Sequence, residues 1–214
     1  MAERKSRADR RRDLIDAARR AMIQHGSEGV HLNQIAKAAG LTSGAVLYHF
    51  PNVRDLLVEA HRAGMERFYE ERVKKIAGVA DPARKLVITI RSGLPEGSDD
   101  AGVRLLCELG GAAGRNPVYA TLLTTLFDRQ VSMYQTILET GAARGVFTLA
   151  HDSEVIARNL VALEDAYGYR IIARHHSIDP ETAVRHILEY ARLATGHPLD
   201  LDPDPADAED AEGD

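Results

Sequence analysis

The stretch GSEGVHLNQIAKAAGLTSGAVLYHFPNVRDLL, residues 26–57, decides how this chain folds. Within it, residues 32–39 and 43–49 each show the apolar spacing of a short helix, and Gly40 stands between them. Glycine tolerates the left-handed backbone that ends a helix, so Gly40 can make a tight turn, and Thr42 can cap the second helix. Two short helices joined by such a turn form a helix-turn-helix.

The second of these helices carries the side chains that we expect to contact DNA. Val46 and Phe50 fall four residues apart and are expected on its inner face. Tyr48 and His49 have polar tips that suit phosphate oxygens. The remaining positions are small or unbranched, so this helix can approach base edges in a major groove. They are Thr42, Ser43, Gly44, Ala45 and Leu47.

The order and spacing of these residues resemble the N-terminal domain of the tetracycline-repressor-like (TetR) family of bacterial one-component regulators. That family's pattern is Ile-Ala, two or three residues, Ala-Gly, and a helix that ends in Tyr-x-His-Phe or Tyr-Tyr-His-Phe. A short turn, a Lys and Leu-Leu follow. The resemblance covers about residues 10–60. The matching residues are Ile35-Ala36, Ala39-Gly40, Tyr48-His49-Phe50 and Leu56-Leu57.

The resemblance implies particular roles for the residues of the second helix. Thr42, Tyr48 and His49 lie where family members touch phosphates. Ser43, Gly44, Ala45 and Leu47 lie where family members reach bases.

Two positions depart from the family pattern. Val53 stands where a Lys commonly begins the fourth helix, although Arg54 follows and can substitute as a phosphate contact. His31 stands where a Thr commonly begins the second helix. These departures bear on individual phosphate contacts and leave the expected fold unchanged.

The rest of the chain also shows helical periodicity, and no segment alternates as a strand does. Three Asx-Pro pairs mark helix starts, because the Asx side chain can accept from free N–H groups and Pro fits the first turn. The pairs are Asp81-Pro82, Asn116-Pro117 and Asp179-Pro180. We therefore expect an all-α fold of about nine helices. They span residues 7–24, 32–39, 43–49, 53–78, 82–92, 100–113, 117–143, 153–175 and 180–195.

Charge and composition divide the chain into three expected regions. The first 64 residues contain 11 Lys and Arg against 7 Asp and Glu, whereas residues 200–214 contain 8 acids and no base. A basic N-terminal part suits an anionic partner, and the last residues have too few apolar side chains to fold alone. We expect a DNA-binding domain over residues 1–52, a helical ligand-sensing and dimerisation domain over 53–197, and an acidic disordered tail over 198–214. The basic residues before Asp13 are either a solvated tail or an arm that reaches a groove.

Several classes of protein are disfavoured. No apolar run reaches the roughly 20 residues that a membrane span needs, and no signal peptide is visible. We therefore expect a cytoplasmic protein. Cys107 is the only cysteine, which excludes an internal disulfide, and we expect it to be a small buried apolar residue. His175, His176 and His186 are expected at the surface or an interface and not at a metal, since adjacent histidines on a helix point apart.

No cofactor, metal or catalytic site is expected, since the sequence has no phosphate-binding Gly loop, no nucleophile motif and no Cys/His ligand set. A DNA-compacting protein would need basic charge throughout, whereas residues 65–199 carry 16 Lys and Arg against 17 Asp and Glu.

The domain behind the helix-turn-helix is expected to hold a small-molecule effector among the fifth to eighth helices. Acids in an apolar pocket would favour a cationic or hydrogen-bonding ligand, because an unpaired buried charge is costly. The residues expected to line the pocket are Glu108, Tyr119, Phe127, Tyr134, Glu164, Asp165 and Tyr167.

The last two long helices are expected to pair two subunits into a homodimer, as the family usually pairs them. The apolar stripes are Val155, Ile156, Leu160, Leu163, Tyr167 and Ile171, then Val184, Ile187, Leu188 and Ala191. Part of each stripe is also expected to face its own core, while Ala166 and Gly168 would allow close approach between subunits. The sequence thus predicts a regulator, acting as a repressor, that binds a palindromic double-stranded DNA operator and is released by a small molecule. The alternative is a helix-turn-helix regulator or activator without a small-molecule ligand.

Overall fold

The computed structural model describes residues 6–27 and 29–199, and over these residues the chain forms nine α-helices and no strand. Their bounds are α1 Arg7–His25, α2 Leu32–Ala39, α3 Ser43–His49, α4 Val53–Ile76, α5 Pro82–Ser92, α6 Ala101–Ala113, α7 Pro117–Ala143, α8 Ser153–Ile172 and α9 Pro180–Thr195. The expected all-α fold is confirmed. None of these helices combines the length and apolar character needed to cross a bilayer.

The residues expected to start and stop helices do so. The Asp81 carboxylate accepts from the Arg84 N–H at 2.8 Å, and the Asp179 carboxylate accepts from the Thr182 N–H at 2.7 Å. Gly40 ends α2 with φ +64° and ψ +35°, a left-handed conformation that costs other residues more. The chain therefore turns directly into α3.

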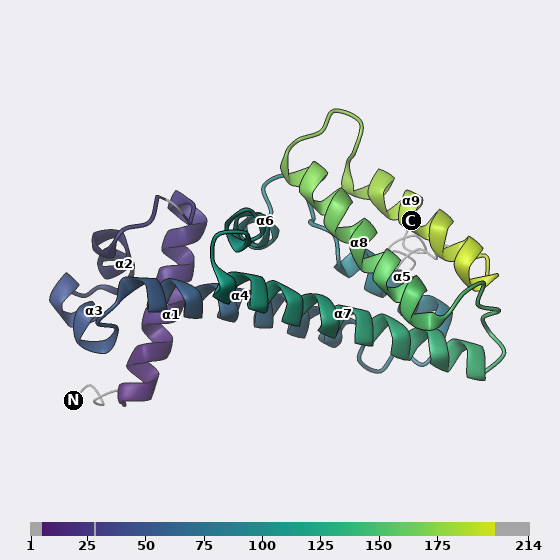
Figure 1. Cartoon of the computed structure of the whole chain (residues 1–214), viewed down its shortest axis with the longest axis horizontal. Coiled ribbons are helices and arrows are strands. Elements are labelled where there is room, and N and C mark those ends of the chain that lie inside the picture. The colour runs from purple at the N-terminus through teal and green to yellow at the C-terminus, as the bar shows by residue number, and fades with distance from the viewer. Residues whose placement is uncertain (1–5, 28, 200–214) are drawn as a thin grey trace, which may run out of the picture.

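The helices form a small N-terminal group and a larger group joined by the long helix α4 (Figure 1). Helices α1, α2 and α3 lie at one end of the molecule, and α5, α8 and α9 lie toward the other. Helix α4 contacts α1 at its beginning and α5, α6 and α7 further along. It is the element that both groups share.

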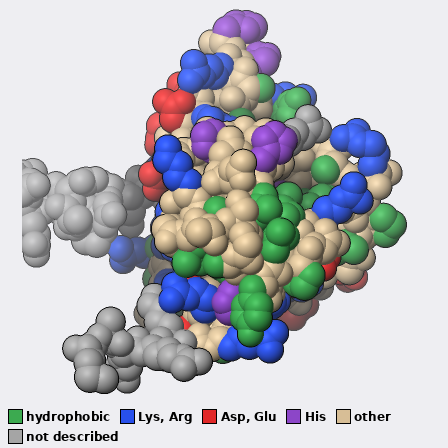
Figure 2. Space-filling view, turned by 90° about the vertical axis from the view of Figure 1, so that its left-hand side faces the viewer, with side chains coloured by type: hydrophobic (Ala, Val, Ile, Leu, Met, Phe, Trp, Pro, Cys, Tyr) green, Lys and Arg blue, Asp and Glu red, His purple; other side chains and the backbone are tan. Residues whose placement is uncertain are grey.

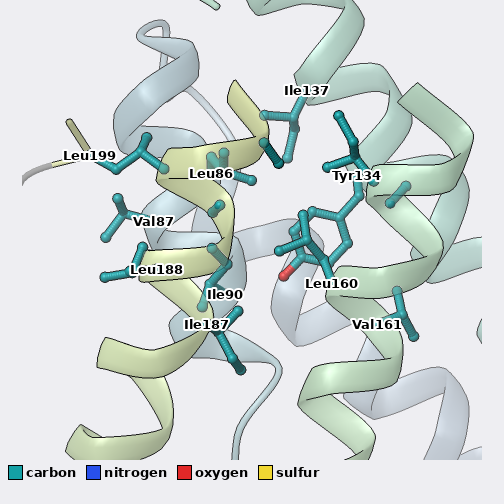
Figure 3. Close-up of a cluster of buried hydrophobic side chains, with 14 of the residues drawn as sticks. Leu86, Val87, Ile90, Tyr134, Ile137, Leu160, Val161, Ile187, Leu188 and Leu199 are labelled. Atoms are coloured by element: carbon teal, nitrogen blue, oxygen red, sulfur yellow. The ribbon is translucent and has the colours of Figure 1, made fainter. Parts of the chain in front are cut away.

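Each group has its own apolar core. The N-terminal core contains Leu14 of α1, Ile35 of α2, Val46 of α3 and Leu56 of α4, all completely buried. In the larger group, side chains from α5, α7, α8 and α9 converge, and Leu86, Leu160 and Ile187 are among them (Figure 3). Helices α1, α2 and α3 are thus held by a core of their own, to which the first turns of α4 and Leu105 of α6 contribute.

Two differences from the sequence expectation lie near the C-terminus. Helix α8 ends at Ile172, so His175 and His176 follow it in a turn, where their rings stack with centroids 4.7 Å apart. Their side chains do not point apart, because the backbone there is not helical. Leu199, assigned above to the tail, is 1% exposed and packs in the larger core. The folded part therefore extends past residue 197, and residues 200–214 lie outside the described residues.

Candidate DNA interface and effector cavity

Helix α3 is short, and its neighbours fix both of its ends. The Thr42 hydroxyl accepts from the Ala45 N–H at 3.2 Å and caps the start. At the other end, Arg11 of α1 donates to the His49 carbonyl at 2.6 Å, and its guanidinium lies 3.9 Å from the centroid of the Phe50 ring. Val46 and Phe50 are buried, as expected. These contacts hold α3 against α1 while its outer face stays free.

The outer face of α3 carries the residues expected to contact DNA. Tyr48 is 73% exposed and Leu47 is 38% exposed. His49 is half-buried, and its ring packs edge-on against Tyr48 with centroids 5.1 Å apart. Thr42, Gly44 and Arg54 are exposed, and Ser43 and Ala45 are half-buried.

One contact on this face concerns a residue that the sequence analysis did not single out. The Ser43 hydroxyl donates to the Asn33 side-chain carbonyl of α2 at 2.9 Å. Asn33 is exposed and joins the two helices of the helix-turn-helix beside the candidate base-contacting positions. The visible signal was its polar side chain on the outer face of an amphipathic helix.

The electrostatics of this face suit a polyanion. From residue 29 to Arg54 the chain contains two basic side chains, Lys37 and Arg54, and no acid. Both are exposed. Figure 2 shows Lys and Arg side chains around an apolar and neutral surface on this end of the molecule, with Asp and Glu mostly toward the edges. A helix framed by positive charge and free of acids can approach phosphates without repulsion.

A cavity of about 640 Å³ lies in the larger group of helices. Its walls come from α4, α6, α7, α8 and the end of α5, and they include aromatic, small and acidic residues. They are Phe68, Gly93, Val103, Leu106, Cys107, Gly110, Gly111, Leu123, Thr124, Leu126, Phe127, Asp128, Gln130, Arg158, Glu164, Asp165, Gly168 and Tyr169. This volume is in the range of small-molecule sites.

The residues expected to line an effector site divide between several places. Phe127, Glu164 and Asp165 lie in the wall of this cavity. Tyr134 is fully buried behind it and contacts Glu164. Tyr167 lies between α8 and α9, where its hydroxyl is 3.3 Å from the His186 Nδ1.

Glu108 and Tyr119 line a second cavity of about 470 Å³, between the N-terminal helices and α6 and α7. The Glu108 carboxylate accepts from both the backbone N–H and the hydroxyl of Ser27, at 2.7 and 2.6 Å. Glu108 therefore fastens the turn after α1 to α6. Cys107, beside it, faces the larger cavity and is half-buried, and burial raises the pKa of its thiol.

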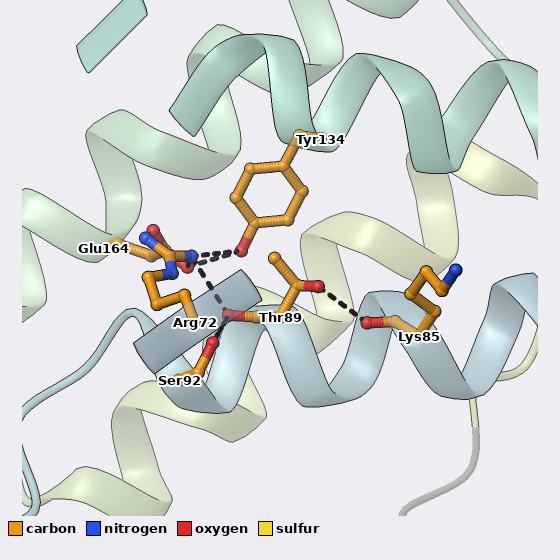
Figure 4. A network of polar contacts seen from close by, with 6 residues as sticks. All are labelled: Arg72, Lys85, Thr89, Ser92, Tyr134 and Glu164. Atoms are coloured by element: carbon orange, nitrogen blue, oxygen red, sulfur yellow. Dashed lines mark hydrogen bonds and ion pairs between the residues drawn. The ribbon is translucent and has the colours of Figure 1, made fainter. Parts of the chain in front are cut away.

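A buried polar network adjoins the larger cavity. Arg72 of α4 and Glu164 of α8 are each 1% exposed and form an ion pair of 2.8 Å. Arg72 also donates to the Thr89 carbonyl of α5 at 3.0 Å, and the Tyr134 hydroxyl donates to Glu164 (Figure 4). Burial raises the pKa of Glu164 to about 7, although Arg72 and Tyr134 act in the opposite direction. Arg72 was not predicted from the sequence.

The stripes expected to pair two subunits face mostly inward. Ile156, Leu160 and Ile171 of α8 and Ile187 and Leu188 of α9 are buried in their own core. Gly168 lines the cavity and is not at the outer surface. The outer surface of these two helices also carries charged side chains, and its apolar and uncharged residues include Val155, Asn159, Ala162, Leu163, Ala166, Tyr190 and Leu193, which are exposed or half-buried. We call this set the outer α8–α9 face.

Sequence comparisons match this chain to bacterial regulators. The family profile described as "Bacterial regulatory proteins, tetR family" matches residues 14–60. An uncharacterised HTH-type transcriptional regulator of Mycobacterium tuberculosis is 36% identical over 117 residues, which cover 51% of this chain and 57% of that protein. The match thus spans little more than half of that relative's length. The nicotine-responsive repressor HdnoR of Paenarthrobacter nicotinovorans is 27% identical over 170 residues, 78% of this chain and 86% of the relative.

Solved structures share the fold. A TetR transcription regulator from Haloarcula marismortui superposes with a TM-score of 0.79 at 23% identity, over 88% of this chain and 99% of the other. A transcriptional regulator from Saccharomonospora viridis in complex with choline superposes with a TM-score of 0.78 at 24% identity, over 86% and 96%. At this identity the likeness concerns the fold.

Proposed function

We propose that this chain, whose residues 14–60 match the profile of the bacterial TetR regulatory proteins, is a transcriptional repressor of that family that binds a palindromic operator as a homodimer and is released by a small molecule. The observation that carries the proposal is the course of α4. Its first turns pack in the N-terminal core at Leu56 and Ala60, whereas Phe68 lines the larger cavity. One continuous helix therefore contacts both candidate sites. The proteins that this chain resembles are regulators, not enzymes.

For the DNA contact, the proposal assigns phosphates to Tyr48, His49, Thr42 and Arg54. It assigns base edges to the group Ser43, Gly44, Ala45 and Leu47. The exposure of Tyr48 and the absence of acids between residue 29 and Arg54 support this assignment.

For the effector, the proposal places a small molecule in the cavity of about 640 Å³. Among similar proteins, one repressor responds to nicotine and one structure holds choline, both of them amines or ammonium ions. Phe127, Glu164 and Asp165 are the wall residues that combine an aromatic surface with negative charge. Such a wall suits an organic molecule with a positive or hydrogen-bonding group.

For the dimer, the proposal pairs the outer α8–α9 faces of two subunits. A two-fold axis would present two α3 helices to half-sites about one helical turn apart, roughly 34–36 Å, or somewhat more. Effector binding would favour one position of α4 and DNA the other, so each ligand weakens binding of the other. The protein would act in the cytoplasm, where its operator lies.

The test begins with selection of binding sites from randomised duplex DNA by the full chain. We expect enriched sites with two-fold symmetry. Tyr48→Phe and His49→Ala should each weaken binding about tenfold by removing a charge-assisted hydrogen bond to phosphate, with a similar loss on all related sites. Leu47→Ala should instead change the preferred sequence.

Arg84→Ala is the matched control, because it removes a surface charge from α5, at the opposite end from α3. Wild-type affinity and salt dependence in the Tyr48 and His49 variants would refute the DNA assignment. A set of compounds that raise the melting temperature and never alter DNA affinity would favour the alternative, a DNA-binding regulator without an effector.

A further inference from the structure

The buried carboxylate of Glu164 uses only one of its two oxygens. Oε1 accepts from Arg72 Nη2 at 2.8 Å and from the Tyr134 hydroxyl. Arg72 Nη2 also donates to the Thr89 carbonyl, so α4, α5, α7 and α8 meet at one point (Figure 4). Within the described part of the chain, Glu164 Oε2 has no hydrogen-bond partner, and neither do Nε and Nη1 of Arg72. A buried carboxylate oxygen without a partner is costly, so the site is incomplete.

Glu164 stands in the wall of the larger cavity. The charged residues of that wall are Asp128, Glu164 and Asp165 against Arg158 alone. Burial, the largest influence on Glu164, disfavours its charged form, and Arg72 only partly offsets this. A second positive charge at the cavity wall would stabilise the charged form of this carboxylate that burial disfavours. Phe68, Phe127 and Tyr169 add aromatic rings to this wall. The Arg72 guanidinium lies 5.5 Å from the centroid of the Phe68 ring and the Arg158 guanidinium 5.8 Å from that of the Phe127 ring, so two of these rings already attract cations.

We propose that the effector is an organic cation whose charge is balanced by Glu164, and that it competes there with Arg72 and so loosens α4. The inference rests on the proposed function and adds to it the class of the effector and the route by which α4 responds. Two cations that share one carboxylate repel each other, so binding of the ligand weakens the ion pair between Arg72 and Glu164.

The position of Arg72 makes this exchange effective at the DNA-binding helices. Arg72 is in the last third of α4, about 24 Å along the axis from Leu56 at 1.5 Å per residue. Leu56 is completely buried in the N-terminal core. A displacement of α4 at Arg72 is therefore transmitted to α1, α2 and α3 through a continuous helix.

The test uses permanently charged probes and neutral or anionic counterparts. The cations are choline, tetraethylammonium and benzyltrimethylammonium. The counterparts are 3,3-dimethylbutan-1-ol, benzyl alcohol and benzoate. Calorimetry gives each affinity for the full chain, and fluorescence anisotropy gives the affinity for a selected operator with and without each probe. We expect at least one cation, and none of its counterparts, to weaken operator binding tenfold or more.

Arg72→Met and Arg129→Met are the matched pair of variants. Arg129 of α7 forms an ion pair with Glu66 of α4 at 2.7 Å, so it also ties α4 to a neighbour, but it does not line the cavity. Arg129→Met should keep the wild-type effect of the cation on DNA affinity. Arg72→Met should reduce that effect to less than twofold. If the cation weakens operator binding equally in the wild type and in Arg72→Met, the proposed competition between the cation and Arg72 for Glu164 is overturned.

Glu164→Gln should weaken binding of the cation about tenfold. The single variant Glu164→Gln leaves Arg72 buried without a counter-ion and can fail to fold. The double variant Arg72→Met with Glu164→Gln removes both charges and keeps the test valid in that case. That variant should bind the cation no better than its neutral counterpart. Effectors that are exclusively neutral or anionic would overturn the inference and leave the sensor role intact. If no probe of any charge alters operator binding, both the inference and the effector part of the proposed function are contradicted.

Discussion

His61 of α4 is a titratable residue placed where it cannot easily be charged. Its side chain is 4% exposed, and its ring packs edge-on against Tyr119 with centroids 5.2 Å apart. Burial lowers the pKa of His61 to about 4, although Glu108 raises it. The folded protein therefore keeps His61 neutral at a pH where the unfolded chain already binds a proton.

This burial predicts a loss of stability in acid. Between pH 6.5 and about 4 the unfolded chain binds more protons at His61 than the folded one, so the free energy of unfolding falls as the pH falls. Glu164 acts in the opposite sense, because its raised pKa makes the folded state bind a proton below about pH 7. The contribution of Glu164 is the same in the wild type and in His61→Leu, so it cancels when the free energies of unfolding of these two proteins are compared. The wild type should lose up to about 3 kcal/mol relative to His61→Leu between pH 7 and pH 4.

Chemical denaturation at each pH measures the difference. His151→Leu is the control, because this histidine is exposed. Parallel profiles for the wild type and His61→Leu would contradict the assignment of the neutral form.

Gly93 lets α5 end directly against the ion pair. A Cβ at this position would lie 2.1 Å from the Glu164 carboxyl carbon, a distance that side chains do not tolerate. We expect Gly93→Ala to lower the free energy of unfolding by roughly 1–3 kcal/mol through overpacking. Gly114→Ala is the control, since its Cβ would meet nothing within 4 Å and its φ is −62°. Equal thermal stability of the two variants would show that the Glu164 side chain can move aside.

Sequence could predict which residues face inward but not which helix each would meet. Phe127, Glu164 and Asp165 were expected together and lie in one cavity wall. Tyr134 and Tyr167 have the same periodicity but face other helices, because helix orientation depends on the whole core. Arg72 was not distinguished from the other charged residues of α4. One signal was available: Met65, Tyr69, Arg72 and Ile76 follow the spacing of an inward stripe, in which a charged residue needs a partner.

At the scale of elements, α3 depends on its surroundings. Its seven residues are too few for a stable isolated helix, so capping and tertiary contacts must hold it. The contacts of Arg11 with the His49 carbonyl and the Phe50 ring supply one of these restraints. Arg11 was expected within the first helix and was also grouped with the basic residues of a tail or arm; in the structure it lies in α1 and supports α3.

We therefore predict that Arg11→Gln loosens α3 beyond the effect of losing a charge. Amide hydrogen exchange over residues 43–50 should become faster, and operator affinity should fall about fivefold to tenfold, as expected for a charge-assisted hydrogen bond. Arg12→Gln is the control, because Arg12 is exposed and pairs with Asp9 within α1. The same exchange rates in both variants would mean that Arg11 does not restrain α3.

Helix bounds were the most predictable feature of this chain. The Asx-Pro pairs and Gly40 are local signals, since each acts through the backbone groups beside it. The end of α8 was placed three residues too late, at residue 175 instead of Ile172. No Gly or Pro marks that end, and Arg174 adopts a φ of +56° without a sequence signature. The arrangement of the helices around the cavity came from tertiary packing, which no local signal encodes.

At the scale of the whole molecule, the candidate DNA interface and the larger cavity lie toward opposite ends of helix α4. Helix α4 begins in the N-terminal core and ends beside Arg72, and Glu108 of α6 adds a second connection through Ser27. Under the proposed function a single subunit would read only one half-site, because one α3 would contact few base pairs. In a symmetric dimer there would be two α4 helices, and an effector that moves them would change the distance between the two α3 helices.

The outer α8–α9 face is the surface that would join two such subunits. Leu193 is 80% exposed and Val155 is 49% exposed, while Ala162 and Ala166 leave room for a helix to approach. Helix α8 is about 30 Å long at 1.5 Å per residue. Because α8 and α9 pack side by side about 10 Å apart, the outer face of this pair is about 20 Å wide and has an area on the order of 500–600 Å². Burying this face on both subunits reaches the roughly 1,000 Å² that a specific interface needs.

The full chain should therefore sediment at twice its own mass at micromolar concentration. Ala162→Arg with Leu193→Arg places two charges per subunit on exposed positions of this face, so the variant should stay folded and sediment as a monomer, because unpaired buried charge would oppose association. Leu188→Arg is unsuitable for this purpose, since Leu188 is completely buried in the core of its own subunit. Val118→Arg, at an exposed apolar residue of α7, is the matched control and should remain dimeric. A double variant that stays dimeric with native helicity would assign the interface to another surface, and a wild-type monomer would remove the basis for a palindromic operator.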